Sequence, residues 1–203
     1  MTRRRIVSGA ASAAGRGSRA VFLDRDGVIN EEVDYLGRPD QFHLLPGSAK
    51  AIRLLRKCGY RVVVVTNQSG LARGYFCVAD LDSIHERMRC DLARARTRVD
   101  GIYICPHHPA DGCSCRKPGG LLFQQAAQDL KLDLADSYYV GDKLTDLLPA
   151  VSLGGRTVLV LTGHGKRELE LAGQQGFVPD YVAVDLYAAA RWIVVSNEDP
   201  PRL

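Results

Sequence analysis

The sequence predicts an α/β protein with a doubly wound, mostly parallel sheet. Short runs rich in β-branched and aromatic residues alternate with stretches in which apolar residues recur every three or four positions. Residues 62–65 are four valines in succession, which is typical of a strand covered on both faces, as in a parallel sheet. Strands that alternate with helices along a chain build a sheet with helices on both sides.

The expected strands, in chain order, lie at residues 20–23, 62–66, 101–105, 138–140, 157–161 and 181–184. Apolar residues at helical spacing occupy residues 52–58 and 81–95, between the first three of these strands. In doubly wound sheets, ligands bind beyond the carboxyl ends of the strands, so residues that directly follow strands are the candidates for function.

The length of 203 residues, 46% of them hydrophobic, suits one domain with a full core. We expect that domain at residues 19–195, with a short C-terminal tail at residues 196–203. Residues 1–18 are rich in Arg, Ala, Ser and Gly, which predicts a disordered basic tail. The segment at residues 31–46 is too short for a separate cap domain, so we expect only a minimal cap.

The net charge of +4 does not indicate a polyanionic partner. Five of the 27 basic residues are arginines within the first 19 residues, which contain no acid, so 22 basic residues remain beside 23 acidic ones. No stretch reaches the roughly 18 apolar residues of a membrane span. We therefore expect a monomer in the cytoplasm that binds a small molecule, with neither nucleic acid nor membrane as a partner.

Two aspartates directly follow the first expected strand. Asp24 and Asp26 lie one residue apart, and alternation along an extended chain would point both the same way and Arg25 elsewhere. Two carboxylates in one small space can hold a divalent cation, and one can attack a substrate while the other transfers a proton. Alone, the string Asp-x-Asp-Gly is as typical of a turn as of a site.

Polar residues also follow the next three strands, which favours a site. Thr66 and Asn67 follow the second strand, the pair Arg116 and Lys117 comes after the third, and Asp142 follows the fourth. Alone, Thr66 would be a hydroxyl that caps a strand end, and Lys117 would be a solvated surface lysine. Together, the four loops indicate one functional edge of the sheet.

A phosphate that approaches two carboxylates is repelled, so phosphoryl transfer at this edge requires Mg²⁺ and a cationic side chain. We expect Asp24, Asp26 (through its backbone carbonyl) and Asp142 to hold Mg²⁺, because hard oxygen ligands suit this ion. Lys117 would supply the positive charge.

A loop after the third strand contains Cys105, His107, Cys113 and Cys115. Three thiolates and one imidazole complete the tetrahedral shell that structural Zn²⁺ prefers. Such a cluster indicates metal ligands in a reducing compartment rather than disulfides. His108 is the alternative to His107, and a reduced loop without metal is the alternative to the zinc site.

In chain order, the strings Asp24-Arg25-Asp26-Gly27, Val65-Thr66-Asn67, Arg116-Lys117-Pro118 and Val140-Gly141-Asp142-Lys143 resemble the four motifs of haloacid-dehalogenase (HAD)-type phosphatases. The resemblance covers residues 20–161 and implies an HAD-like Rossmannoid fold. It implies that Asp24 is the nucleophile that forms an aspartyl-phosphate, and that Asp26 protonates the leaving alkoxide and then activates water. Thr66 and Lys117 would hold the phosphoryl oxygens.

Longer strings, at residues 22–30, 64–74 and 101–109, resemble the branch of this family that removes the 7-phosphate of heptose bisphosphates in lipopolysaccharide precursor biosynthesis. The likeness implies that Arg116 recognises the distal part of a sugar bisphosphate. It also implies a substrate site formed by Glu32, Val33, Asp34, Tyr35, Thr66, Asn67, Gln68, Ser69, Arg116, Lys117 and Lys143.

Two alternatives remain open. Histidinol-phosphate phosphatases resemble the chain in the compact length of the zinc loop, so loop length does not separate the two substrates. A nucleic-acid-binding zinc module is less favoured, because the loop lacks interleaved aromatic residues and extended basic clusters.

Overall fold

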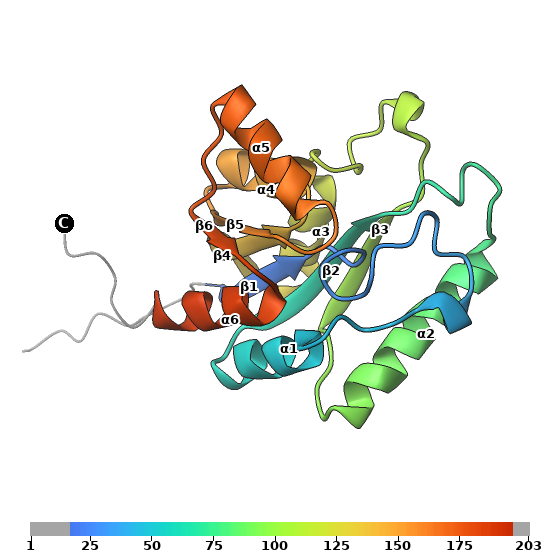
Figure 1. The fold of residues 1–203 in the computed structure, drawn as a ribbon, viewed down its shortest axis with the longest axis horizontal. Coiled ribbons are helices and arrows are strands. Elements are labelled where there is room, and N and C mark those ends of the chain that lie inside the picture. Colours follow the sequence, from blue (N-terminus) through green and yellow to red (C-terminus); the bar gives the residue numbers. More distant parts are fainter. Residues whose placement is uncertain (1–16, 197–203) are drawn as a thin grey trace, which may run out of the picture.

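A computed structural model describes residues 17–196 and contains a single six-stranded sheet in the order β3-β2-β1-β4-β5-β6 (Figure 1). Every neighbouring pair of strands is parallel. The strands are β1 (Ser18–Leu23), β2 (Arg61–Asn67), β3 (Gly101–Cys105), β4 (Leu132–Gly141), β5 (Arg156–Val160) and β6 (Tyr181–Ala183). All six expected strands and the α/β class are confirmed.

The fourth strand is longer than expected, because its first residues pair with the start of β1. Leu132 pairs with Ser18, and the register shifts between Arg19 and Val21 before the regular pairing resumes. Ser18 thus differs from the expectation of a tail at residues 1–18, since its N–H also donates to the Lys131 carbonyl at 2.9 Å. Residues 1–16 and 197–203, on which the remaining tail predictions fall, lie outside the described residues.

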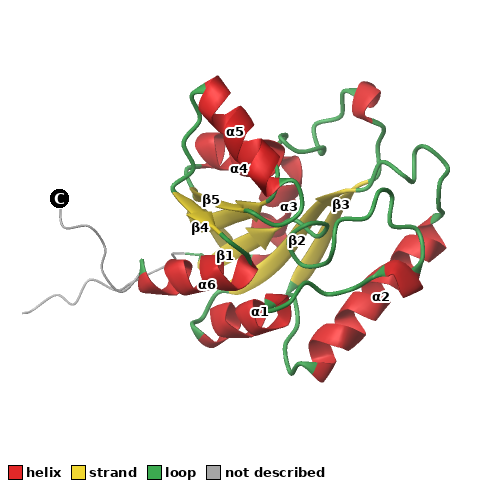
Figure 2. Ribbon diagram, viewed as in Figure 1, coloured by secondary structure: helices red, strands yellow, loops and turns green. Residues whose placement is uncertain are grey.

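Helices cover both faces of the sheet (Figure 2). One group comprises α1 (Ser48–Lys57), α2 (Val78–Arg94) and α6 (Leu186–Val195). The other comprises α3 (Leu121–Leu130), α4 (Leu144–Leu153) and α5 (Gly165–Gln175), with short 3-10 turns at Pro39–Gln41 and Pro109–Asp111. None of the helices within residues 17–196 combines the length and apolar character needed to cross a membrane.

Alternate residues of the central strands divide the core into two layers. Val21 and Val64 face the layer that contains apolar residues of α1, α2 and α6, whereas Phe22 and Val63 face α3. The Phe22 ring packs edge-on against Phe123, with the centroids 5.2 Å apart. The four valines of β2 are therefore buried from both sides, as their continuous run predicts.

The order of the strands places a switch point beside β1. The chain runs from β1 to β2 and β3 on one side, then returns to β4 on the other, so crevices open at the carboxyl ends of these strands. The loops after β1, β2 and β3 all project from this end of the sheet (Figure 1). No further domain covers them among residues 17–196, consistent with a minimal cap.

Candidate active site

A cavity of about 250 Å³ lies at this edge and gathers most of the predicted site residues. Two of the predicted residues, Thr66 and Asp142, are buried and do not line it. The predicted residues that line it are Asp24, Asp26, Glu32, Val33, Asp34, Tyr35, Asn67, Gln68, Ser69, Arg116, Lys117 and Lys143. Residues that the sequence analysis missed are Leu36, Gly70, Thr145, Asp146 and His164.

Lys117 lies between two carboxylates at the floor of the cavity. Its Nζ atom is 2.9 Å from Asp24 Oδ1 and 2.7 Å from Asp146 Oδ1, and it donates to the Val65 carbonyl at 2.7 Å. Burial alone would lower the pKa of Lys117, but the charges of Asp146 and Asp24 outweigh it and raise this pKa. A permanent positive charge therefore adjoins Asp24.

The backbone around Lys117 is tied to the end of β2. The Lys117 N–H donates to Asn67 Oδ1 at 3.1 Å, and Asn67 Nδ2 donates to the Lys117 carbonyl at 3.3 Å. This pair of hydrogen bonds joins two loops that are 50 residues apart in the chain. Asn67 thus positions the cation as well as lining the cavity.

Three buried carboxylates provide a candidate magnesium site. Asp24, Asp142 and Asp146 each offer an oxygen, and these oxygens lie within 4.8 Å of one another. Burial, reinforced by Asp146 and Asp24, raises the pKa of Asp142 to about 8. Burial also raises the pKa of Asp146 to about 6, although the charge of Lys117 opposes this shift. Asp142 Oδ1 is buried without a hydrogen-bond partner among residues 17–196. Crowded oxygens with a free acceptor fit a hard divalent cation.

Asp146 is the member of this cluster that the sequence analysis missed. It lies in the first turn of α4, four residues after Asp142, and its Oδ2 accepts the Lys143 N–H at 3.0 Å. An acid in the first turn of a helix is ordinarily a capping residue. The feature of the sequence that could have indicated Asp146 is its spacing, since it lies one helical turn after Asp142.

The Asp26 carboxylate does not belong to the metal cluster but is held by Arg25. Arg25 Nη2 donates to Asp26 Oδ2 at 2.8 Å, and Nε donates to Oδ1 at 3.1 Å. The expectation that Arg25 points away was wrong, because β1 ends at Leu23 and strand alternation does not extend through these residues. Burial would raise the pKa of Asp26, but Arg25 and further hydrogen bonds outweigh it, so the pKa is lowered.

Two amide side chains complete the surroundings of Asp26. Asn30 Nδ2 donates to Asp26 Oδ1 at 2.9 Å, and Gln68 Nε2 donates to Asp26 Oδ2 at 2.9 Å. The same Gln68 nitrogen also contacts Thr66 Oγ1 at 2.9 Å. Thr66 is thus buried in contact with Gln68, which lines the cavity, and is not itself among the lining residues that could hold phosphoryl oxygens.

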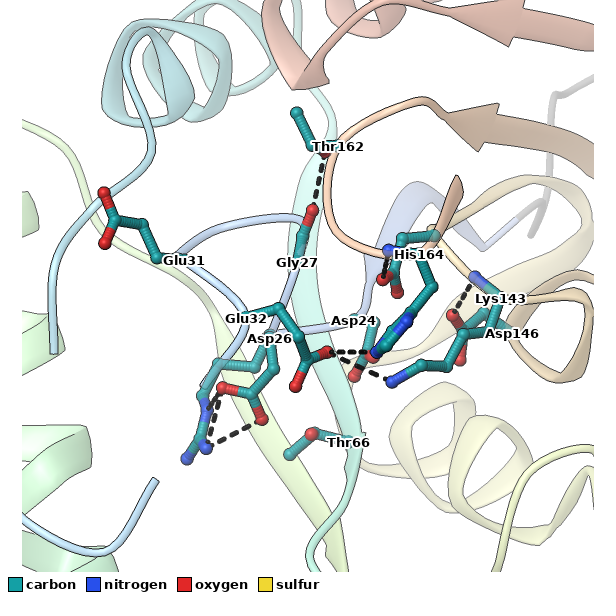
Figure 3. A network of polar contacts seen from close by, with 12 residues as sticks. Asp24, Asp26, Gly27, Glu31, Glu32, Thr66, Lys143, Asp146, Thr162 and His164 are labelled. Atoms are coloured by element: carbon teal, nitrogen blue, oxygen red, sulfur yellow. Dashed lines mark hydrogen bonds and ion pairs between the residues drawn. The ribbon is translucent and has the colours of Figure 1, made fainter. Parts of the chain in front are cut away.

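A charged network joins the loop after β1 to the loops after β4 and β5. Glu32 Oε2 lies 3.1 Å from Lys143 Nζ and 3.4 Å from His164 Nε2, and the three side chains point toward one another in Figure 3. Burial raises the pKa of Glu32 despite these cations. Burial would lower the pKa of Lys143, but Asp142 and Glu32 outweigh it, so this pKa is raised.

His164 is a cavity residue that the sequence analysis missed. The only feature of the sequence that could have indicated it is its position shortly after the fifth strand.

Two glycines enclose the second oxygen of Asp142. A Cβ atom on Gly163, whose φ is +56°, would lie 2.2 Å from Asp142 Oδ2, and one on Gly27 would lie 2.4 Å from the same oxygen. The His164 N–H donates to this oxygen at 2.8 Å. Thr162 Oγ1 donates to the Gly27 carbonyl at 2.6 Å and so holds the two loops together (Figure 3).

The predicted zinc ligands converge in one cluster. The ligand atoms of Cys105, His107, Cys113 and Cys115 lie within 4.8 Å of one another. The distance from His107 Nδ1 to Cys115 Sγ is 3.1 Å, and the three sulfur–sulfur distances are 3.4, 3.4 and 3.6 Å. Sulfurs bound tetrahedrally at about 2.3 Å from zinc would be about 3.8 Å apart, somewhat farther than here, so these four residues could hold that ion after a small outward shift of the sulfurs.

The alternative ligand His108 has a different environment. Its Nδ1 accepts the Ala110 N–H at 3.2 Å, and the half-buried His108 is not among the four clustered side chains. His107 is therefore the histidine that completes the set. Cys58, Cys77 and Cys90 are exposed and lie outside it.

Arg116 directly follows the last cysteine and lines the cavity. Its Nη1 atom is buried, with no hydrogen-bond partner among the described residues. A buried guanidinium nitrogen with a free donor is suited to an anionic group that enters the cavity.

Comparisons with known proteins agree with this geometry. A family model described as HAD-hydrolase-like matches residues 114–189. The chain is 42% identical over 179 residues to a D-glycero-beta-D-manno-heptose-1,7-bisphosphate 7-phosphatase of Bordetella bronchiseptica, which covers 87% of this chain and 98% of the relative. It is 48% identical over 155 residues to the protein of the same name from Haemophilus ducreyi, covering 72% of this chain and 85% of the relative.

A solved structure also superimposes on the whole domain. It is the crystal structure of D,D-heptose 1,7-bisphosphate phosphatase from B. bronchiseptica complexed with magnesium and phosphate. The TM-score is 0.80 at 42% identity, covering 88% of this chain and 99% of that one. These names do not favour the histidinol-phosphate alternative. The fold, the cavity and these relatives together show that the chain belongs to the heptose-1,7-bisphosphate 7-phosphatase family of HAD-like hydrolases.

Proposed function

We propose that the protein is a Mg²⁺-dependent phosphatase that removes the 7-phosphate of D-glycero-D-manno-heptose 1,7-bisphosphate through an aspartyl-phosphate on Asp24. The observation that carries the proposal is the buried Lys117 ammonium between Asp24 and Asp146, at the floor of a cavity beside three clustered carboxylates. Mg²⁺ held by Asp24, the backbone carbonyl of Asp26, Asp142 and Asp146 would offset the repulsion between these carboxylates and an incoming phosphate.

The first half of the reaction transfers the phosphoryl group to the protein. A carboxylate oxygen of Asp24 attacks phosphorus, and the bond between phosphorus and the sugar oxygen breaks. Asp26 gives a proton to the departing alkoxide. Lys117 stabilises the negative charge on the phosphoryl oxygens, because it lies within 2.9 Å of the nucleophile.

The second half releases inorganic phosphate. Asp26, now a carboxylate, takes a proton from water while the water oxygen attacks the phosphorus of the aspartyl-phosphate. Asp24 is regenerated, and the proton gained by Asp26 serves the next turnover. The hydrogen bonds from Arg25, Asn30 and Gln68 favour the carboxylate form that this second step requires.

The distal phosphate of the sugar would bind Arg116. This assignment rests on the free buried Nη1 donor and on the position of Arg116 in the cavity wall. Glu32, Val33, Asp34 and Tyr35 would contact the sugar from the opposite loop, together with Ser69 and Lys143.

One Zn²⁺ held by Cys105, His107, Cys113 and Cys115 would brace the loop that carries Arg116 and Lys117. All four ligand positions are protein atoms, so this ion would be structural. Three thiolates in one cluster also favour a reducing compartment, and on that ground we expect the reaction to take place in the cytoplasm. We further propose that the protein acts as a monomer, with the activity in the single domain at residues 19–195.

Phosphate release by Asp24→Asn tests this function. The variant keeps the shape of the residue but loses the nucleophile, so release from the heptose bisphosphate should fall by about a thousandfold or more. Asp40→Asn is the matched control, since Asp40 is an exposed carboxylate that forms a surface ion pair with Arg38 and does not line the cavity. Near-normal release by Asp24→Asn would exclude covalent catalysis, and faster release from histidinol phosphate than from the heptose ester would exclude the proposed substrate.

A further inference from the structure

One polar side chain of helix α2, that of His85, contacts Arg25 in the loop after β1. None of the described residues that line the active-site cavity belongs to this helix. His85 is 3% exposed, and its Nε2 atom lies 3.3 Å from Nη1 of Arg25. Arg25 is itself 0% exposed. Because a guanidinium group can only donate hydrogen bonds, His85 Nε2 must be the acceptor.

The two contacts of Arg25 use different sides of its guanidinium group. Nε and Nη2 donate to the Asp26 carboxylate, while Nη1 donates to His85. A buried guanidinium without partners on all sides is strongly unfavourable. His85 therefore satisfies the one group of N–H donors that Asp26 does not reach.

The position of His85 on α2 shows that packing alone does not require a histidine. Its neighbours on the buried side of the helix are Leu81, Ile84, Met88 and Leu92. Burial and then the charge of Arg25 lower the pKa of His85 to about 4, with a smaller contribution from Arg89 and an opposing one from Asp26. The ring is thus neutral, with the free lone pair that the contact with Arg25 needs.

We propose that His85 is a positioning residue for proton transfer: it fixes the Arg25 guanidinium, which in turn holds the Asp26 carboxylate in the orientation that meets the leaving group. The inference rests on the proposed function, because that function assigns proton transfer to Asp26. It adds a residue 59 positions from Asp26, on a helix outside the cavity, to the determinants of the reaction.

A leaving-group comparison separates positioning from a purely structural role. A sugar phosphate has an alkoxide leaving group that needs the proton from Asp26, whereas 2,4-dinitrophenolate leaves without one. In single-turnover measurements, His85→Leu should slow release of the sugar by about tenfold to a hundredfold. The same variant should release dinitrophenolate within about threefold of the unchanged protein, because this step bypasses the proton donor.

Two further variants complete the design. His85→Gln restores an acceptor and should recover most of the sugar release, and Met88→Leu controls for repacking of the same helix face. If His85→Leu does not fold, His85→Met fills the site with a flexible apolar chain and serves in its place. Circular dichroism before each assay reports folding.

The outcomes distinguish this inference from the function on which it rests. The positioning role is overturned if a folded His85→Leu variant releases the sugar and dinitrophenolate with equally reduced rates, or if its rate of sugar release is unchanged. Either result leaves the phosphatase assignment intact. An unchanged protein that releases no phosphate from the sugar bisphosphate overturns the assignment and the positioning role together.

Discussion

At the scale of single residues, the active site is defined by charges that are buried and paired. Lys117 is buried with Asp24 and Asp146 within 2.9 Å of its ammonium group. Such a group is stable only with its partners in place, since loss of one leaves an uncompensated buried charge. The site therefore combines catalytic chemistry with a requirement that its members fold together.

His85 provides a pH test at the same scale. Its pKa is lowered from 6.5 to about 4 in the folded protein, so between these values the unfolded chain binds more protons. Stability should therefore fall as the pH drops from about 6.5 to about 4, by roughly 3 kcal/mol in total. Urea unfolding across this range measures the loss.

The matched variant for this titration is His85→Gln, which keeps an acceptor for Arg25 but does not titrate. The unfolding free energy of the unchanged protein should decline relative to that of the variant below about pH 6.5. Parallel curves for the two proteins would show that His85 does not titrate in this way.

At the scale of elements, the loop between β5 and α5 supports the cluster of Asp24, Asp142 and Asp146 without contributing a carboxylate to it. Gly163→Ala would place a methyl group 2.2 Å from Asp142 Oδ2, at a backbone φ of +56° that favours glycine. The displaced carboxylate should weaken Mg²⁺ binding by about tenfold or more. Calorimetric titration with Mg²⁺ in the absence of substrate measures this change.

Gly173→Ala in α5 is the control for this substitution. A Cβ atom at Gly173 meets nothing within 4 Å, so the variant should bind Mg²⁺ normally and gain about 0.5 to 1 kcal/mol in helix stability. Equal Mg²⁺ affinity of the two variants would contradict the supporting role of the β5–α5 loop.

The zinc loop is the second element with a testable role. Cys115→Ser should abolish zinc binding, measured as metal content by mass spectrometry, and should lower the free energy of unfolding by about 3 kcal/mol because zinc binds only the folded loop. It should also raise KM, since Arg116 follows Cys115 directly. Cys90→Ser, at an exposed cysteine in α2, controls for the chemical change. Zinc retention by Cys115→Ser would contradict the ligand assignment.

At the scale of the whole molecule, one parallel sheet brings five loops to a single edge. The order β3-β2-β1-β4-β5-β6 places β1 between β2 and β4, so Asp24, Asp142 and Lys117 meet although they lie far apart in the chain. The segment at residues 31–46 supplies Glu32, Val33, Asp34, Tyr35 and Leu36 to the cavity lining, and the zinc loop precedes Arg116 and Lys117, so these two loops would influence which sugar phosphate enters. The ion pairs of Glu32 with Lys143 and His164 join the segment at residues 31–46 to the loops that follow β4 and β5.

The sequence by itself determined the class of fold, the chain order of the strands, the pair of aspartates after β1 and the cluster of three cysteines and one histidine. These features depend on local periodicity and on spacing along the chain, which the covalent order preserves. Only the tertiary structure decided that Asp146 joins the metal cluster, that His164 contacts Glu32, and that Arg25 turns toward Asp26. Those outcomes depend on rotamers and loop contacts between distant segments, and no short window of sequence encodes them.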